Sequence, residues 1–379
     1  MKLAIVDQTG NKIGGAQTSL ELFLHHLPPD IEATVIFFED GSFAERVRKL
    51  GVSTQVVPLG ESVRRVTREG FGLDAVRLIP GALKPLVAVL RGVCPDIVYT
   101  NGIKAHVLGS LAARRIAVPS VVHHRDILTG TTRLAFLAVV AMCSKARIAT
   151  SSNVARAYPL PNTTIVDNPI DLASYHDILK PEAARAKLGI EAGAPIAAIV
   201  GRINRWKGID RFLRALAVVN GRTKLRGLIV GAPHFRDADQ IPELYALRSK
   251  LGLNDLVSFV DWVDDARTVY AAIDVNVNTS NREPFGRTII EAAACGVPSV
   301  CFDDSGVSET MQNGISGIVV RAHDETALAQ ALSFYASDAK RRAEASIAAR
   351  TWSQRFDATL HARRVANILR ANSKRELAS

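Results

Sequence analysis

Two short stretches of the chain carry side chains whose types and order could bind a charged ligand. Residues 201–208 hold two cations, Arg202 and Lys207, between glycines. Residues 283–291 hold a carboxylate at each end, Glu283 and Glu291. Cations attract phosphates, and carboxylates accept hydrogen bonds from hydroxyl groups. Together the two stretches could hold a sugar attached to a nucleoside diphosphate.

The cation stretch lies at a predicted strand-to-helix turn. An apolar strand over 196–200 leads into Gly201, and a helix with one apolar face follows Gly208. Arg202, Lys207 and the amides of the helix N-terminus would converge on a diphosphate. The same cations would stabilise the charge that a departing diphosphate gains. The alternative is a glycine turn with two solvated cations; the stretch is not a P-loop, because its Gly-Lys-Ser/Thr ending is absent.

The acidic stretch surrounds the start of another predicted helix. Phe285 and Gly286 open this helix, so that the amides of Gly286 and Arg287 can face a phosphate. Glu291, inside the helix, suits a ribose, and Glu283 suits a sugar ring. For either carboxylate alone, a helix cap or an ion pair is the simpler interpretation. The order and spacing of both, together with the cation stretch, favour the ligand interpretation.

A glycine pair in the first half, Gly14 and Gly15, follows the opening strand. Glycines at such a turn let the backbone approach phosphates closely. The pattern is weak by itself, because any tight turn can use glycine.

The predicted strand 120–123 ends in titratable residues: His123, His124, Arg125 and Asp126. Alternation along a strand places His123 with Arg125 on one face and His124 with Asp126 on the other. Asp126 is a candidate base or hydrogen-bond partner for an acceptor hydroxyl. Which histidine faces a ligand stays open, and one of them could instead be satisfied by a backbone carbonyl.

Short apolar strands that alternate with helical patterns predict an α/β protein of two doubly wound, Rossmann-like domains. Ligands of such sheets bind at the carboxyl ends of the strands, and the cleft between two facing domains is the expected site. The predicted strands are 2–6, 33–38, 55–57, 97–100, 120–123, 147–150 and 164–167, then 196–200, 227–230, 257–260, 275–278, 299–302 and 317–320.

The second half, from residue 194 to about 332, resembles the group 1 glycosyltransferases of family 4, which have the GT-B fold. Those enzymes share the Gly-Arg…Lys-Gly stretch, and two glutamates separated by seven residues with Phe-Gly between them. The resemblance implies a retaining sugar transfer without a bound metal or other cofactor. It implies that Arg202 and Lys207 bind the diphosphate, Glu291 the ribose, and Glu283 with the Phe285–Gly286 backbone the donor sugar. The family also has a glycine pair at Gly14 and Gly15, and a histidine near His123 and His124.

The resemblance also implies a domain plan. An acceptor-binding domain over 1–170 is expected, followed by a nucleotide-sugar domain over 171–351. A final helix over about 352–370, with Trp352, Phe356, Leu360, Val365 and Leu369 at helical spacing, is expected to return to the first domain.

The net charge of +10 is concentrated in the first half. Residues 43–156 carry 17 Lys and Arg against 6 Asp and Glu, which implies an anionic partner. The basic segment 61–68, with cations nearby, could rest on an anionic membrane. The longest apolar run, 134–143, is too short to span a bilayer. A cytoplasmic protein, either free or peripheral on the inner face of the plasma membrane, is therefore expected.

The leading hypothesis is a glycosyltransferase that uses a UDP- or GDP-sugar and an acceptor hydroxyl on a glycan or lipid-linked glycan of the cell envelope. The alternatives are a nucleotide-sugar epimerase or a glycosidase on a similar frame. A nucleic-acid-binding protein is disfavoured, because aromatic residues make up only 6% of the chain. A metal site at Asp303 and Asp304 is disfavoured, because a third ligand at suitable spacing is absent.

Overall fold

The computed structural model describes residues 1–11, 13–61, 63, 73–191, 193–221, 223–233, 237–304 and 306–374. The chain forms two compact units. Unit 1 comprises Met1–Pro169 and Ala358–Ser379, and unit 2 comprises Ile170–Asp357. The chain therefore returns to unit 1 after Asp357.

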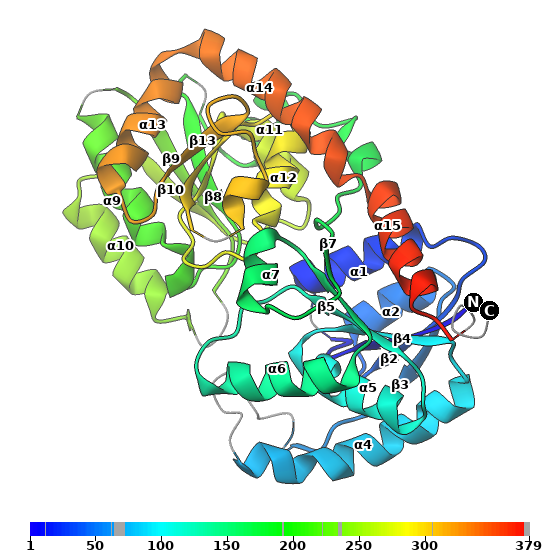
Figure 1. The fold of residues 1–379 in the computed structure, drawn as a ribbon. Helices are drawn as coiled ribbons and strands as arrows, with labels where there is room; N and C mark the ends of the chain where they lie inside the picture. Colours follow the sequence, from blue (N-terminus) through cyan, green and yellow to red (C-terminus); the bar gives the residue numbers. More distant parts are fainter. Residues whose placement is uncertain are drawn as a thin grey trace. The chain divides into compact units, whose positions relative to one another are not determined.

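Unit 1 is built on a parallel sheet with the strand order β3-β2-β1-β4-β5-β6-β7 (Figure 1). The central strands read as continuous apolar runs because helices cover both of their faces. Its strands are β1 (Lys2–Asp7), β2 (Glu32–Phe37), β3 (Ser53–Val56), β4 (Ile97–Asn101), β5 (Ser120–His124), β6 (Ala146–Ala149) and β7 (Thr163–Ile165).

Two helical layers cover this sheet. The helices of unit 1 are α1 (Gly15–His25), α2 (Ser42–Lys49), α4 (Leu73–Val93), α5 (Ile103–Arg115), α6 (Thr131–Cys143), α7 (Ser152–Ala157) and α15 (Ala358–Ala371). Helices α1, α2 and α15 share one apolar core with the sheet, whereas α4 to α7 pack into two further clusters. Helix α15 lies beside α1, although the two are far apart in the sequence (Figure 1).

Unit 2 repeats this plan with a parallel sheet of order β10-β9-β8-β11-β12-β13. Its strands are β8 (Ile196–Val200), β9 (Arg226–Val230), β10 (Val257–Val260), β11 (Val275–Asn278), β12 (Ser299–Asp303) and β13 (Gly317–Arg321). In both sheets the strand order reverses beside the first strand, which is the point where doubly wound sheets bind ligands.

The helices of unit 2 also form two layers. They are α8 (Pro181–Lys187), α9 (Ile209–Asn220), α10 (Gln240–Lys250), α11 (Ala266–Ala272), α12 (Arg287–Ala294), α13 (Glu325–Ser337) and α14 (Ala339–Ser353), with short 3₁₀ turns η1 (Leu172–Tyr175), η2 (Arg205–Lys207), η4 (Val307–Glu309) and η5 (Gln354–Phe356). Helices α9, α10 and α13 pack on one face of the sheet, and α8, α11 and α12 on the other. None of the described helices combines the length and apolarity needed to cross a bilayer.

All thirteen strands predicted from the apolar runs are present, with ends that differ by a few residues at most. The final helix expected over about 352–370 is α15, which begins only at Ala358 because η5 separates it from α14. The apolar spacing there serves two cores. Phe356 packs with Ile170 and Phe285 in unit 2, whereas Val365 and Leu369 pack in unit 1. Leu360, which the spacing placed on the buried face, is 42% exposed.

Candidate functional site

The turn that follows β8 is held against the turn that follows β9 by two glycines. The Gly201 amide donates to the Val230 carbonyl at 2.9 Å, and the Ile203 amide donates to the Ala232 carbonyl at 3.1 Å. Gly201 and Gly231 both have positive φ. A Cβ atom at Gly231 would lie 2.0 Å from the Gly201 carbonyl oxygen, so only glycine fits there. Arg202 therefore leaves the sheet from a backbone that is fixed on both sides.

The second half of this turn is fastened to the end of β11. The Asn204 side chain accepts a hydrogen bond from the Lys207 amide, which caps η2. Gly208 has a left-handed conformation, and a Cβ atom there would lie 2.4 Å from the Thr279 carbonyl oxygen. The Thr279 hydroxyl contacts the carbonyls of Lys207 and Gly208 at 2.9 Å each. These contacts set the direction in which the Lys207 side chain leaves the backbone.

The two predicted phosphate-binding cations differ in their surroundings. Lys207 Nζ lies 2.8 Å from Glu283 Oε2, and the two side chains are only 14% and 11% exposed. Lys207 Nζ also lies 4.4 Å from the centre of the Trp206 ring. Arg202 is exposed, and within the described ranges it makes no ion pair or side-chain hydrogen bond. The structure thus brings the two sequence stretches together through Lys207 and Glu283, whereas Arg202 makes no ion pair with the described residues.

The stretch from Glu283 to α12 is anchored by its aromatic residue. Phe285 is buried beside Phe356, with ring centroids 5.9 Å apart. The Glu283 carbonyl accepts a hydrogen bond from the Gly306 amide at 2.9 Å. Gly286 has φ +91° and precedes α12 without a side-chain cap. The amino end of α12, with its positive helix dipole, therefore begins directly after Gly286.

Glu291 has a partner for each carboxylate oxygen. Oε1 accepts from Arg287 Nη2 at 3.1 Å, one turn earlier in the helix, and Oε2 accepts from the Tyr270 hydroxyl at 3.2 Å. Burial, reinforced by the charge of Glu291, holds the pKa of Tyr270 well above its usual value, so its hydroxyl stays a donor. The Glu291 side chain is 17% exposed. Its orientation is thus fixed on one side, and its exposed part can accept further hydrogen bonds.

In unit 1, Gly14 and Gly15 start helix α1 just after β1. Gly14 is extended and no side chain caps the helix at this residue. The Gly14 carbonyl accepts the hydrogen bond of the Thr18 amide at 2.9 Å, which begins the helical ladder. The first turn of α1 contains no acidic side chain. Its amides therefore form a positive helix end at the carboxyl side of the sheet.

His123 lies on the same face of β5 as Arg125, as strand alternation predicts. Its Nδ1 atom is 2.6 Å from the Tyr99 hydroxyl and 3.2 Å from Arg125 Nη2. The residue is fully buried, and burial together with the Arg125 charge lowers its pKa well below the usual value. His123 is therefore a neutral, hydrogen-bonded member of the interior.

His124 lies on the opposite face, in an aromatic environment. Its ring stacks on Tyr158 at 4.5 Å and meets the edges of His106 and Phe136. Burial lowers its pKa to about 3, so the imidazole is neutral at physiological pH. Its Nε2 atom has no hydrogen-bond partner in the described part of the chain. Asp126, two residues beyond the strand end, is half-buried.

A buried polar network that the sequence analysis missed joins the ends of β1, β4 and β5. Asp7 Oδ2 accepts from Asn101 Nδ2 at 2.5 Å, and Asp7 Oδ1 accepts from the Gln17 amide group at 3.3 Å. Arg125 Nε donates to Asn101 Oδ1 at 3.0 Å, and Arg125 also donates to Asn168. Burial raises the pKa of Asp7 to about 6. The sequence contained one signal of this network, because Asp7 is a charged residue at the end of an otherwise apolar strand.

Comparison with known proteins separates the two halves of the chain. Residues 181–352, most of unit 2, match the sequence model of the family Glycosyl transferases group 1. A D-inositol 3-phosphate glycosyltransferase of Stackebrandtia nassauensis is 36% identical over 181 residues, which are 46% of this chain and 41% of that protein. One from Thermobispora bispora is 30% identical over 224 residues, which are 55% and 50% of the two chains. The chain thus matches about half the length of these curated relatives.

Comparison of structures covers nearly the whole chain. Anabaena Alr3699/HepE, crystallised in complex with UDP, has a TM-score of 0.84 and 26% identity, over 98% of this chain and 100% of that chain. Sucrose-phosphate synthase of Thermosynechococcus elongatus has a TM-score of 0.82 at 19% identity, over all of both chains, which shows likeness of fold alone. The protein has the GT-B fold of glycosyltransferases, and its second unit is similar in sequence to their group 1 domain.

The predicted Asp303–Asp304 pair lies at the end of β12, where Asp303 is exposed. Across the described residues, His, Cys, Asp and Glu side chains do not gather in groups of three that could hold a metal ion.

Proposed function

We propose that this protein is a glycosyltransferase that moves a sugar from a nucleoside-diphosphate sugar to an acceptor hydroxyl. The observation that carries the proposal is the Lys207–Glu283 pair. Residues 76 positions apart meet at 2.8 Å where β8 and β11 end, at the point of the sheet where doubly wound folds bind ligands. The same unit matches the group 1 glycosyltransferase model.

In this proposal, unit 2 holds the donor. Arg202 and Lys207 bind the diphosphate, assisted by the amides of Phe285, Gly286 and Arg287 at the start of α12. Glu291 accepts hydrogen bonds from the ribose hydroxyls, since Arg287 and Tyr270 hold its carboxylate in one orientation. Glu283 accepts from a hydroxyl of the donor sugar.

UDP is the proposed donor nucleotide. Support comes from Anabaena Alr3699/HepE, which was crystallised with UDP and with UDP-glucose and whose likeness extends over 98% of this chain. GDP is the alternative that the motifs alone leave open.

The bond from the anomeric carbon to the diphosphate oxygen breaks, and its electron pair leaves with the diphosphate. The charge of Arg202 and Lys207 stabilises this leaving group. The acceptor oxygen forms the new bond to the anomeric carbon, and its proton passes to the Asp126 carboxylate. Retention of the anomeric configuration, as in the family 4 enzymes that the sequence resembles, is part of the proposal.

Unit 1 is proposed to bind the acceptor. Gly14 and Gly15 expose the positive end of α1, which suits a phosphate. The imidazoles of His123 and His124 stay neutral because of burial, so they are assigned as hydrogen-bonding groups and not as proton carriers. The proposed acceptor is a glycan or lipid-linked glycan of the cell envelope.

Titration calorimetry with UDP, GDP, ADP and dTDP tests the donor assignment. We expect UDP to bind best, and the Arg202→Ala and Lys207→Ala variants to lose affinity for it. Incubation with UDP-glucose and either lipid-linked glycans or inositol 3-phosphate then tests the acceptor, with NMR of the product to read the anomeric configuration. If none of the nucleotides bound the wild-type protein, the proposed function would be wrong.

A further inference from the structure

The outward side of helix α6 is apolar from Leu134 to Met142. Leu134 and Met142 are 65% and 63% exposed, among the most exposed large apolar side chains of the described residues. Ala138 and Ala141 are exposed between them. Positions 134, 138, 141 and 142 fall on one side of a helix, so these side chains form one continuous strip. We call this strip the α6 outer face.

The opposite side of α6 is well packed. Phe136 and Val140 are buried in an apolar cluster with Val122 and Tyr158. Arg147, itself buried, donates to the carbonyls of Val140 and Ser144 at 3.0 and 2.9 Å, which closes the carboxyl end of the helix. The α6 outer face is therefore presented by a helix that is fixed on its other side.

Surface helices normally place polar side chains outward, because the outward side meets water. In α6 the ten residues from Leu134 to Cys143 include no polar or charged side chain. Among them, Leu134 and Met142 lie outside the buried core of unit 1, whereas Phe136 and Val140 belong to it. Contiguous exposed apolar surface of this kind marks a site of contact with another apolar phase or partner.

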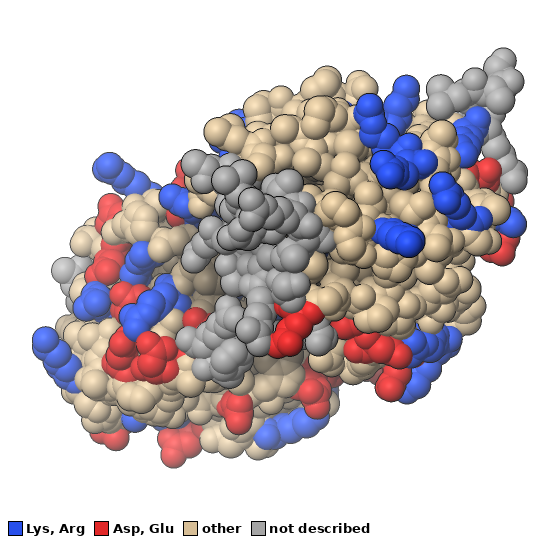
Figure 2. Space-filling model, turned by 90° about the horizontal axis from the view of Figure 1, so that it is seen from below, with Lys and Arg blue, Asp and Glu red and all other residues tan. Residues whose placement is uncertain are grey.

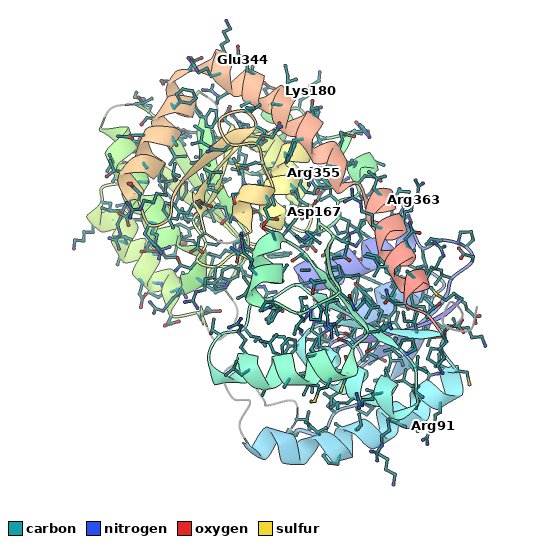
Figure 3. The ribbon with its side chains drawn as sticks, viewed as in Figure 1. Arg91, Asp167, Lys180, Glu344, Arg355 and Arg363 are labelled. Atoms are coloured by element: carbon teal, nitrogen blue, oxygen red, sulfur yellow. The ribbon has the colours of Figure 1, made fainter. Side chains whose placement is uncertain are left out.

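Cations border the α6 outer face without acidic neighbours in the sequence. Residues 97–166 contain eight Lys and Arg but only one carboxylate, Asp126. Arg115 and Lys145 are exposed near the carboxyl ends of α5 and α6, and Arg114 donates to the Met142 carbonyl. Arg91 projects outward from the end of α4 (Figure 3). From the side of the molecule on which α4 lies, basic side chains gather in one region among uncharged surface (Figure 2).

We propose that the α6 outer face docks on an anionic phospholipid surface. Leu134 and Met142 would enter the boundary between headgroups and acyl chains, while Arg115 and Lys145 contact lipid phosphates. The apolar run is about 15 Å long, about half the thickness of a bilayer core, so α6 lies along the surface and does not cross it. Pairing with a second copy of the chain is disfavoured, because it would bring two sets of cations together.

The basic segment 61–68, which the sequence analysis assigned to membrane contact, falls mostly outside the described residues. Two of the cations near it in the sequence, Arg46 and Arg48, form ion pairs with Glu21 and Asp40. The proposal therefore rests on α6 and does not depend on that segment. It is also independent of the donor proposed for unit 2.

Vesicle flotation of the full chain tests this proposal, with vesicles of phosphatidylcholine alone or with about 30% phosphatidylglycerol. The wild-type protein should float with the anionic vesicles and bind neutral ones more weakly. Leu134→Gln with Met142→Gln should weaken binding about tenfold. Arg115→Gln with Lys145→Gln should weaken it about fivefold for each cation, and only for anionic vesicles. Arg114 is left unchanged, because it supports the end of α6.

The matched control is Ile347→Gln with Lys340→Gln on α14. Ile347 is 71% exposed and Lys340 is exposed, so one exposed apolar residue and one exposed cation are changed to glutamine at a site in unit 2. It should float like the wild type. Equal flotation of the Leu134/Met142 variant and the control would refute the proposal. So would a concentration-dependent dimer that the Leu134/Met142 variant loses, with no wild-type binding to vesicles. UDP affinity, measured on each variant, reports separately on the proposed function and on correct folding.

Discussion

The carboxyl edges of the two sheets carry polar groups of opposite character. In unit 2 the groups are ionised and partly exposed: Lys207 with Glu283, and Arg287 with Glu291. In unit 1 they are buried and mostly hydrogen-bonded to one another, with His123, His124 and His106 held neutral. The same kind of edge thus presents ion pairs near solvent in one unit, and a buried network with neutral imidazoles in the other.

This difference indicates a division of labour. Paired charges near solvent can exchange partners when a phosphate arrives, because the ligand replaces the lost interaction. Buried hydrogen-bonded groups keep one geometry, and the neutral imidazoles among them suit the orientation of uncharged hydroxyls. We therefore expect substitutions in unit 2 to change nucleotide affinity, and substitutions in unit 1 to change turnover or stability.

The largest effect is expected from Lys207→Ala. The substitution removes the proposed charge-assisted contact to the diphosphate and leaves Glu283 without its lysine partner. The loss should be about 3 kcal/mol, or roughly a hundredfold in the Kd for UDP. Titration calorimetry measures it. Arg205→Ala is the matched control, because Arg205 lies in the same turn but pairs with Asp239 and Glu243 on the surface. An equal loss in both variants would contradict the assignment.

Asp7 tests the buried edge of unit 1 through the pH dependence of stability. Its folded pKa is about 6, raised from 3.8 by burial. A raised pKa means that the folded state binds the proton more tightly than the unfolded state. Protonation of Asp7 therefore stabilises the folded protein fully below about pH 4, and this stabilisation is lost as pH rises through about 6. The change is about 3 kcal/mol at most.

The measurement for Asp7 is the free energy of unfolding in urea between pH 4 and 8. The difference between wild type and Asp7→Asn should change over the window from about pH 4 to 6, because Asn does not titrate. Asp303→Asn, at an exposed strand end, is the control, because it makes the same substitution without removing a buried carboxyl group. A constant difference between wild type and Asp7→Asn across the window would exclude the proposed burial effect.

His124→Phe should preserve the stack on Tyr158 and remove the unpartnered Nε2 atom. We expect stability within about 1 kcal/mol of wild type and kcat lower by roughly tenfold to a hundredfold. The shape of the pH profile of kcat should not change, because the wild-type imidazole, with a pKa of about 3, does not titrate in the working range. Loss of a limb of that profile in the variant would show that His124 carries a proton.

The sequence predicted the strands of both units and the pairing of two distant motifs, because these depend on local apolar runs and on contiguous residues. It did not predict which carboxylate pairs with Lys207, since that depends on the angle at which two loops leave the sheet. The Asp7–Asn101–Arg125 network was missed because its members are single polar residues at the ends of three strands that are far apart in the sequence. The start of the final helix was predicted too early, because Phe356 and Val365 share a helical spacing although they pack in the cores of two different units.

The smallest predicted effect is the sharpest test of the comparison, because its sign differs between two measurements. Glu283→Gln removes the carboxylate that neutralises Lys207, so the lysine charge becomes available to the diphosphate. UDP affinity should rise about threefold to tenfold, as expected when a like charge near a phosphate is removed. Turnover of the UDP-sugar should fall, because the hydrogen bond to a sugar hydroxyl is weakened. Calorimetry with UDP and a UDP-release assay measure the two effects. If UDP bound less tightly to Glu283→Gln, Glu283 would be a positioning residue for Lys207, and the edge of unit 2 would act as a fixed framework like that of unit 1.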